Sequence, residues 1–249
     1  MSSRLLIILG DNDTASIGNM LGRTYGMAAQ VYGASVHYLN LNRLCFGPVP
    51  LPQETCPVLF APDLREAQEL LRWADHTVWT YSLTWGGMPA LLKCFTDRVF
   101  IPEFAYQGQL GTPGCVPLLS GKSADILVTL GSLPWYNRLG TDAAATRQLR
   151  QTVLQPAGMG PVRSFTFGPA RRATAARMDR WTARVVDLAA AGLGQAVSEE
   201  TLNQGLSPDF PEPTTRSAPL ALAATGTESL PGGFSTNLID SHVRTSLFR

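Results

Sequence analysis

The sequence predicts an α/β fold in which five parallel strands form one sheet with helices on both of its faces. Five short apolar runs, each ended by glycine or polar residues, alternate with stretches whose apolar residues recur at helical spacing. The first run, Arg4–Leu9, is continuously apolar after its arginine, as expected of a strand buried on both faces of a parallel sheet. Strands that alternate with helices predict repeated βαβ units.

The first half of the chain carries two of these strands. Arg4–Leu9 is followed by a polar loop and a helical pattern that runs to about Tyr32. The second strand is Ala34–Leu39. A connection over 40–62, rich in proline and glycine, leads to a short helix over Asp63–Arg72, whose first residue is the expected N-cap.

The second half supplies the other three strands. His76–Tyr81 is the third strand, and a helix follows whose apolar residues fall at helical spacing: Met88, Leu91, Leu92, Phe95 and Val99. A glycine- and proline-rich excursion over 107–121 comes next. The remaining elements are expected to be a strand over Ala124–Thr129, a helix from about Asp142 to Leu154, a strand over Val162–Phe167 and a final helix over Arg171–Leu193.

The connections decide how these strands are ordered. Right-handed crossovers between parallel strands give a doubly wound sheet, for which we expect the strand order 2-1-3-4-5. Ligands of such sheets bind outside the carboxyl ends of the strands, at the point where the strand order reverses. The loops after strands 1, 3 and 4 surround that point, so we expect them to make one site.

The composition of the chain changes near residue 197. Residues 1–196 hold all five predicted strands and form the predicted domain. The extension over 197–249 is rich in proline, serine, threonine, glycine and alanine, without a sustained period, and its prolines between 208 and 219 exclude a regular helix there. A few apolar residues in this extension are compatible with packing across a partner subunit.

Charge and cysteine usage exclude several classes of function. The net charge of +1, from 20 basic and 19 acidic residues, offers no field that would attract nucleic acid or an anionic membrane. No apolar run approaches the ~20 residues of a membrane span, and the apolar run near the start is too short for a signal peptide. The four cysteines form no CxxC pair and have no nearby histidine, so no metal site is expected. The sequence predicts a cytoplasmic protein.

The loop after the first strand has the composition of an anion-binding loop. It carries glycine and hydroxyl residues and leads into a helix, whose N-terminus offers unpaired N–H groups and the positive end of the helix dipole. Four residues are expected to hold a phosphate there: Thr14, Ser16, Gly18 and Asn19.

The loop after the third strand suits a flat ligand. Thr84, Trp85, Gly86 and Gly87 offer a hydroxyl, an aromatic plate and backbone that a ligand can approach closely. Burial of Trp85 in the core is the alternative, because most large aromatic side chains are buried. Its place in a loop at the carboxyl end of a strand favours the ligand site.

Over residues 81–106 the chain resembles the flavodoxin-like NAD(P)H:quinone oxidoreductase family. The flavin-binding segment of that family runs close to F-P-L-x-W-x-G-M-P-A-x-L-K and then D-R-V-F-x-x-x-F-A-Y. The matching residues are Trp85, Gly87, Met88, Pro89, Ala90, Leu92, Lys93, Asp97, Arg98, Val99, Phe100, Phe104, Ala105 and Tyr106. The resemblance extends more weakly from Arg4 to about Ala191 and leaves the extension uncovered.

This resemblance implies a flavodoxin-like fold and flavin chemistry. Members of the family transfer hydride from NAD(P)H to a flavin, usually FAD and sometimes FMN, and then to a quinone or similar flat electrophile, in a ping-pong cycle. Their site lies at a homodimer interface. The chain is therefore expected to be a homodimeric enzyme with a quinone-like substrate and a bound FAD, with FMN as the alternative.

The resemblance also assigns roles to residues. Four residues of the second loop would border the isoalloxazine ring: Leu83, Thr84, Trp85 and Gly86. Four residues of the third loop would face the pyrimidine edge of that ring: Thr129, Leu130, Gly131 and Ser132. The N–H groups of Gly131 and Ser132 would stabilise the reduced, anionic ring. Tyr136 would donate a proton or stabilise charge, and Tyr106 would line the quinone cleft.

Three departures from the family pattern keep other functions open. Asp11 replaces a histidine of the family, Gly86 stands where an aromatic residue is common, and no histidine follows Tyr136 closely. One alternative is a regulatory protein, similar to the ancillary subunits of potassium-efflux antiporters. Another is an FMN electron carrier, although carriers of this fold are commonly acidic and shorter. NAD(P)H oxidation with a quinone separates an enzyme from both.

The other titratable residues have structural interpretations. His37 and His76 stand at predicted strand starts, where hydrogen-bonded structural histidines are expected. Arginines gather near the last strand and helix: Arg163, Arg171, Arg172, Arg177, Arg180 and Arg184. Their mixed spacing predicts a solvated face, and contact of Arg171 or Arg172 with a cofactor phosphate is the alternative.

Overall fold

The computed structural model describes residues 3–46, 61–131 and 146–194. Its elements in chain order are β1 (Arg4–Leu9), α1 (Ile17–Val31), β2 (Ser35–Asn40), η1 (Leu41–Arg43), α2 (Pro62–Trp73), β3 (His76–Ser82), α3 (Ala90–Val99), β4 (Tyr106–Gln107), β5 (Val116–Pro117), β6 (Ser123–Thr129), η3 (Gln148–Leu154), β7 (Val162–Phe167), η4 (Ala170–Arg172) and α6 (Ala175–Gly192). Ser132, Tyr136 and the extension over 197–249 lie outside the described residues.

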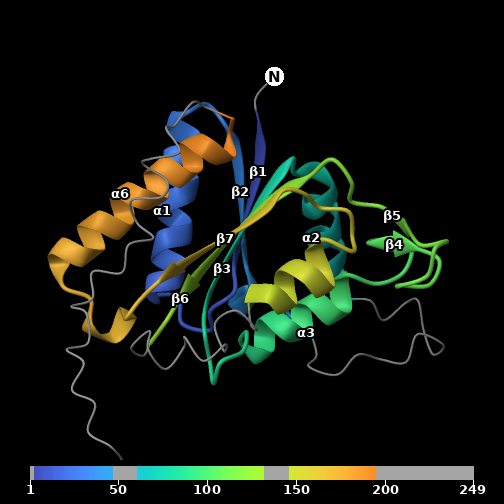
Figure 1. The fold of residues 1–249 in the computed structure, drawn as a ribbon, viewed down its shortest axis with the longest axis horizontal. Coiled ribbons are helices and arrows are strands. Elements are labelled where there is room, and N and C mark those ends of the chain that lie inside the picture. The colour runs from blue at the N-terminus through green and yellow to red at the C-terminus, as the bar shows by residue number, and fades with distance from the viewer. Residues whose placement is uncertain (1–2, 47–60, 132–145, 195–249) are drawn as a thin grey trace, which may run out of the picture. The chain divides into compact units, whose positions relative to one another are not determined.

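Five strands form one parallel sheet in the order β2-β1-β3-β6-β7 (Figure 1). This confirms the predicted order 2-1-3-4-5. β1 pairs with β2 on one side and with β3 on the other, so that Leu9 lies opposite both Asn40 and Thr80. The strand order therefore reverses at β1, and the loops after β1 and β3 flank the reversal point.

Helices cover both faces of the sheet. α1 and α6 lie on one face, and α2, α3 and η3 lie on the other (Figure 1). Along β1, Leu6 and Ile8 pack into the core on the α2 and α3 face, whereas Leu5, Ile7 and Leu9 pack into the core on the α1 and α6 face. Because alternate side chains of a strand point to opposite faces, burial on both sides requires a continuous apolar run.

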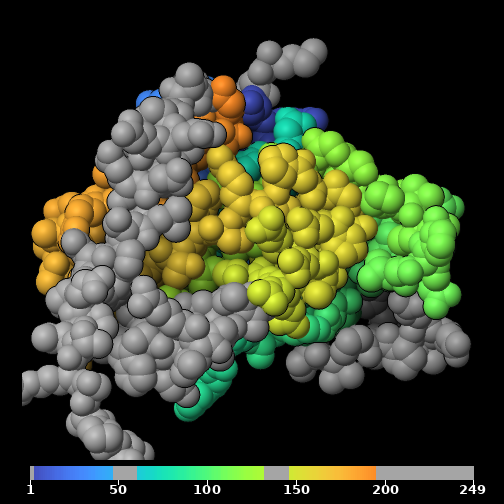
Figure 2. Space-filling model, viewed as in Figure 1, coloured from blue at the N-terminus to red at the C-terminus, as the bar shows by residue number. Residues whose placement is uncertain are grey.

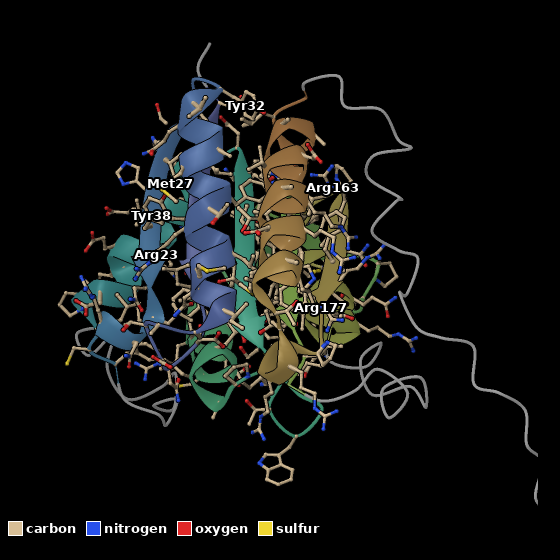
Figure 3. All side chains as sticks on the ribbon, turned by 90° about the vertical axis from the view of Figure 1, so that its left-hand side faces the viewer. Arg23, Met27, Tyr32, Tyr38, Arg163 and Arg177 are labelled. Atoms are coloured by element: carbon tan, nitrogen blue, oxygen red, sulfur yellow. The ribbon has the colours of Figure 1, made fainter. Side chains whose placement is uncertain are left out.

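Different helices form the outer surface on the two sides of the sheet. In Figure 2, the residues around η3 (yellow) occupy the middle of the surface, between α6 (orange) and the β4 and β5 hairpin (green). Figure 3 shows α1 and α6 side by side on the face of the sheet opposite to η3. Met27 and Tyr38 lie on the β2 side of α1. No helix among the described residues is both long and apolar enough to cross a membrane.

Helix α1 lies close to the sheet because glycines line its inner face. Gly18, Gly22 and Gly26 recur every four residues and are buried. A Cβ atom added at Gly22 would lie 2.7 Å from Thr80 Cγ2 and 2.8 Å from Leu9 Cδ2. A side chain at this position would therefore push the helix away from β1 and β3.

A buried polar network joins the helices to the sheet. The Tyr25 hydroxyl donates to Asp125 Oδ2 at 2.9 Å and lies 3.1 Å from His76 Nε2. Arg163 donates to both carboxylate oxygens of Asp125, at 2.7 and 2.6 Å. The other ring nitrogen of His76 lies 2.7 Å from Ser123 Oγ. His76 is thus a hydrogen-bonded structural histidine, as its position at a strand start predicts.

The starts of two helices differ from the prediction. α2 begins at Pro62, and Asp63 does not cap it, because the N-cap residue is Ala61 and proline is well suited to the first helical position. The Asp63 carboxylate instead accepts a hydrogen bond from Cys45 N at 2.6 Å. The last helix is also shorter than predicted. Ala170–Arg172 forms a separate 3₁₀ turn, and Thr174 caps α6 through Arg177 N.

Two further elements were not expected in the form that the structure shows. The excursion over 107–121 includes β5, which forms a small antiparallel hairpin with β4. The described part of the predicted helix over 142–154 contains a π-helical segment, η3. Short strand pairs and the type of a helical turn depend on local hydrogen bonds, for which apolar periodicity gives no signal.

Candidate functional site

Hydrogen bonds tie together the carboxyl ends of β1, β3 and β6. The Asp11 carboxylate follows β1 and accepts from Ser82 N at 2.6 Å and from Ser82 Oγ at 2.8 Å. Ser82 Oγ also lies 2.7 Å from Thr129 Oγ1, at the end of β6. Leu83 N donates to Thr129 O at 2.9 Å. The three loops that the strand order places at the reversal point therefore start from one polar cluster.

Asp11 is turned into the protein. Its side chain is buried, and it accepts a third hydrogen bond from the Ser16 hydroxyl at 2.6 Å. Ser16 is the N-cap residue of α1, and its Oγ also accepts from Asn19 N at 3.0 Å. Asp11 therefore places a negative charge at the positive end of the α1 dipole, where it is favoured. All three of these hydrogen-bond donors are neutral.

This arrangement changes the roles of the predicted phosphate-binding residues. Gly18 and Asn19 are buried, and Asn19 Nδ2 donates to Asp13 O at 2.8 Å. Within the described chain, Asn19 Oδ1 is buried without a hydrogen-bond partner. The Ser16 hydroxyl is already bonded to Asp11, so Ser16, Gly18 and Asn19 shape the loop from inside. Thr14 is exposed and can face a ligand together with first-turn N–H groups of α1.

Trp85 stands at the tip of a tight turn. Thr84 and Gly87 exchange both of their backbone hydrogen bonds, each at 3.0 Å, and the two residues between them have positive φ. Trp85 has φ +53° and Gly86 has φ +76°, as in a type I′ turn. The Trp85 side chain is fully exposed, so the alternative of a buried core tryptophan is wrong. A left-handed conformation costs a residue other than glycine about 1–2 kcal/mol.

This turn explains one departure from the family pattern. The φ of Gly86 lies in the left-handed region, where glycine carries no steric penalty and an aromatic residue does. The glycine therefore suits the turn that holds Trp85 outward. Leu83, before the turn, is half-buried against the core on the α2 and α3 face.

The third loop begins inside the protein and emerges at Gly131. Thr129 and Leu130 are buried, so they serve the site through their backbone and through the bond of Thr129 to Ser82. Gly131 is exposed. Among the described residues outside its chain neighbours, the atom nearest to a Cβ added there is Arg171 Nε, at 3.6 Å. The described part of the chain therefore leaves the backbone at Gly131 open to a ligand, with Arg171 beside it.

Tyr106 lies apart from these loops. It belongs to β4, pairs with Pro117 of β5 and packs against the core on the α2 and α3 face. In Figure 1, β4 lies beyond the end of α3 that is far from the β3 loop. Helix α3 alone spans ten residues, or about 15 Å. Within one chain, the structure does not bring Tyr106 to the predicted site residues that it describes.

Ser82 is a site residue that sequence reasoning missed. It is the last residue of β3, and it is the only residue in the described chain that bonds to both Asp11 and Thr129. A polar residue at the end of an apolar strand is the available signal. Among the described residues, no group of three or more histidine, cysteine, aspartate or glutamate side chains could hold a metal ion.

Known proteins share this fold and part of this sequence. Residues 3–191 match the family described as flavodoxin-like fold. An uncharacterized NAD(P)H oxidoreductase of Haemophilus influenzae is 26% identical over 170 residues, which cover 67% of this chain and 83% of the relative. The solved NAD(P)H:quinone oxidoreductase of Methanothermobacter marburgensis has a TM-score of 0.62 at 19% identity, covering 76% of this chain and 98% of that one.

A third neighbour is an FMN-dependent NADH-azoreductase of Bacillus anthracis, solved in complex with FMN. It has a TM-score of 0.60 at 16% identity and covers 76% of this chain and 99% of its own. At such identities the two solved structures establish the fold alone, whereas the family match spans most of the chain. The chain therefore belongs to the flavodoxin-like fold family, and within it the chain resembles an NAD(P)H oxidoreductase.

Proposed function

We propose that the chain is a flavin-dependent NAD(P)H oxidoreductase that reduces quinones or similar flat electrophiles. The observation that carries this proposal is the exposed Trp85, held outward on a turn whose conformation is unfavourable for tryptophan. Backbone strain of this kind persists where the surroundings enforce it, and it clusters at ligand sites. An exposed indole beside open backbone is suited to stack against a flat ring.

The residues of the three loops fit a flavin. Trp85 offers its face to the ring, and the exposed backbone of Gly131 offers its N–H to the pyrimidine edge. Thr14 and the first turn of α1 offer donors for the phosphate end. When bound, a flavin would supply the two-electron chemistry: hydride transfer from NAD(P)H and then to an acceptor, in two separate half-reactions. The chain binds the ring, orients it and leaves one face open.

We favour FMN as the cofactor, with FAD as the alternative. The support is the azoreductase neighbour, whose structure was solved in complex with FMN. Asp11 and Asp13 add negative charge next to the phosphate position, and this charge affects the binding of either cofactor. The cofactor that the protein binds therefore has to be identified directly. Chromatography of the flavin released from the purified protein identifies it.

We further propose a homodimer that works in the cytoplasm. Tyr106 lies beyond α3 from the loops of its own chain, so a role in the quinone cleft requires the Tyr106 of a second copy. Light scattering on the purified protein tests the dimer. The three described cysteines, Cys45, Cys94 and Cys115, form no disulfide with one another, as expected in a reducing compartment.

The decisive experiment combines flavin uptake with turnover. Purified protein is expected to bind FMN or FAD stoichiometrically and to oxidise NADH or NADPH with a quinone. Trp85→Gly keeps the turn, because glycine tolerates positive φ, and is expected to weaken flavin binding at least tenfold. Gly131→Val is expected to abolish flavin retention by blocking the backbone. Val31→Ala, which trims another exposed apolar side chain, is the control and should bind flavin normally.

One observation favours a second candidate, a regulatory protein that has lost its cofactor. Asp11 already places a carboxylate at the α1 N-terminus, where an anion would bind. A folded protein that takes up neither flavin and does not oxidise NAD(P)H would overturn the enzyme proposal and support this candidate. Normal flavin content in folded Gly131→Val would instead contradict the assignment of the third loop.

A further inference from the structure

Arg171 is fixed beside the third loop by backbone hydrogen bonds. Leu130 N donates to Phe167 O at 2.8 Å, and Ala170 N donates to Leu130 O at 2.6 Å. These bonds join the end of β6 to the start of η4. The side chain of Arg171 then lies along Gly131, with Nε 3.6 Å and Cγ 4.0 Å from the position of an added Cβ atom.

Close packing reinforces this position. A Cβ atom added at Gly168 would lie 2.8 Å from Leu130 Cβ, so the chain between β7 and η4 runs directly against the chain after β6. The backbone around η4 therefore holds the Arg171 guanidinium next to Gly131, although Arg171 is an exposed residue.

The charges around the site are divided between its two sides. From Gly168 to Met178 the chain carries Arg171, Arg172 and Arg177 and no acidic residue. Figure 3 shows Arg177 near the start of α6, the helix in which this stretch ends. On the α1 side of the site, Asp11 and Asp13 are negative. The arginines of this stretch thus place positive charge on the side of the site that adjoins Gly131, and the two aspartates place negative charge on the other side.

We propose that Arg171 stabilises the negative charge that a bound flavin acquires on reduction, and thereby raises its reduction potential. This rests on the proposed function and deepens it. Hydride transfer moves two electrons and one proton from NAD(P)H, which leaves as NAD(P)⁺, and adds one negative charge to the flavin. At the pyrimidine edge, the Gly131 N–H and the Arg171 guanidinium would lie next to this negative charge and stabilise it electrostatically.

The neighbouring Arg172 provides a matched control. Both arginines belong to η4 and both are exposed. Successive side chains of a 3₁₀ turn point about 120° apart, because this helix has three residues per turn. Arg172 therefore carries the same charge on the same turn, and it is Arg171 that contacts the position above Gly131.

The test is the midpoint potential of the flavin-loaded protein, measured by spectroelectrochemical titration for wild type, Arg171→Gln, Arg171→Lys and Arg172→Gln. Arg171→Gln is expected to weaken the binding of reduced relative to oxidised flavin about tenfold, a shift of about 30 mV to more negative potential for a two-electron couple. Arg171→Lys keeps the charge and should recover most of the shift. Arg172→Gln should stay close to wild type.

The outcomes separate the two proposals. Equal potentials in Arg171→Gln and Arg172→Gln, with normal flavin content, would overturn the role of Arg171 and leave the oxidoreductase assignment standing. A wild-type protein that binds no flavin would overturn both. Thermal unfolding of each variant checks folding, which is expected to be unchanged because both side chains are exposed.

Discussion

Asp11 shows how one residue sets the geometry of the site. Its carboxylate connects β1, the end of β3 and the cap of α1 through three hydrogen bonds. In the resembling family this position carries a histidine, which can both donate and accept, whereas an ionised carboxylate only accepts. The neighbours here are matched to an acceptor, since Ser16 and Ser82 turn their donors toward it.

Removal of the Asp11 carboxylate should destabilise the protein. Asp11→Ala leaves the Ser82 N–H and two hydroxyl groups without their acceptor, and each buried unsatisfied group costs about 1–3 kcal/mol. We expect the free energy of unfolding to fall by about 3 kcal/mol. Asp11→Asn keeps an acceptor and should lose less. Urea titration measures both, with exposed Asp13→Ala as the control; equal losses in all three variants would contradict this role.

At the scale of the element, α1 forms a helix although its sequence has several residues of low helix propensity. Gly22 and Gly26 each cost about 1 kcal/mol relative to alanine in a helix interior. The helix is stabilised by the apolar side chains that face the sheet, including Leu21 and Ala29, and by close approach to the strands. Tertiary packing therefore outweighs the local preference.

Gly22→Ala should separate these two effects. Alanine raises helix propensity, yet its Cβ would meet Thr80 Cγ2 at 2.7 Å and Leu9 Cδ2 at 2.8 Å. Overpacking of this kind typically costs about 1–3 kcal/mol, so we expect a net loss of stability. Gly114→Ala is the control, because no atom of the described residues outside its chain neighbours lies within 4 Å of its added Cβ. A Gly22→Ala variant as stable as wild type in thermal unfolding would mean that α1 can shift freely.

At the scale of the whole molecule, one buried network links both helices of a face to three strands. Asp125 of β6 connects Tyr25 of α1, His76 of β3 and Arg163 of β7, and the Tyr25 hydroxyl also contacts Leu188 O of α6. Burial alone would raise the pKa of Asp125. The interactions with His76 and Arg163 outweigh burial, so its pKa lies below the ordinary value.

This pKa shift makes a prediction about acid stability. Because the native pKa is below the unfolded value of about 3.9, the carboxylate stabilises the fold above that pH, and the contribution is lost as the pH falls below it. Asp125→Asn is expected to lose about 3 kcal/mol at pH 7, since Arg163 loses a buried partner. Urea midpoints should show this gap narrowing between pH 5 and pH 3; a constant gap would contradict the charge-based account.

The extension after residue 196 is expected to be dispensable for the domain. The five strands of the sheet and the helices described on its two faces all lie between Arg4 and Gly192. A chain that ends at residue 196 should therefore keep its free energy of unfolding within about 1 kcal/mol, the usual range for changes away from a core. Urea titration of the shortened and full chains tests this. A large loss would show that the extension packs on the domain.

The sequence by itself determined the strands, their order and the loops that surround the site. These depend on apolar runs, glycine breaks and the handedness of crossovers, which are local or topological properties. It also predicted that Trp85 and Gly131 lie in loops at the same edge of the sheet.

Only the tertiary structure decided which side chains face the site. Asp11 bonds to Ser82, 71 residues away, and this contact turns the carboxylate and Ser16 inward. Arg171 reaches Gly131 because backbone bonds join η4 to the end of β6. Local periodicity places a residue on an element, but the direction of its side chain depends on partners that are distant in the chain and meet only when the sheet forms.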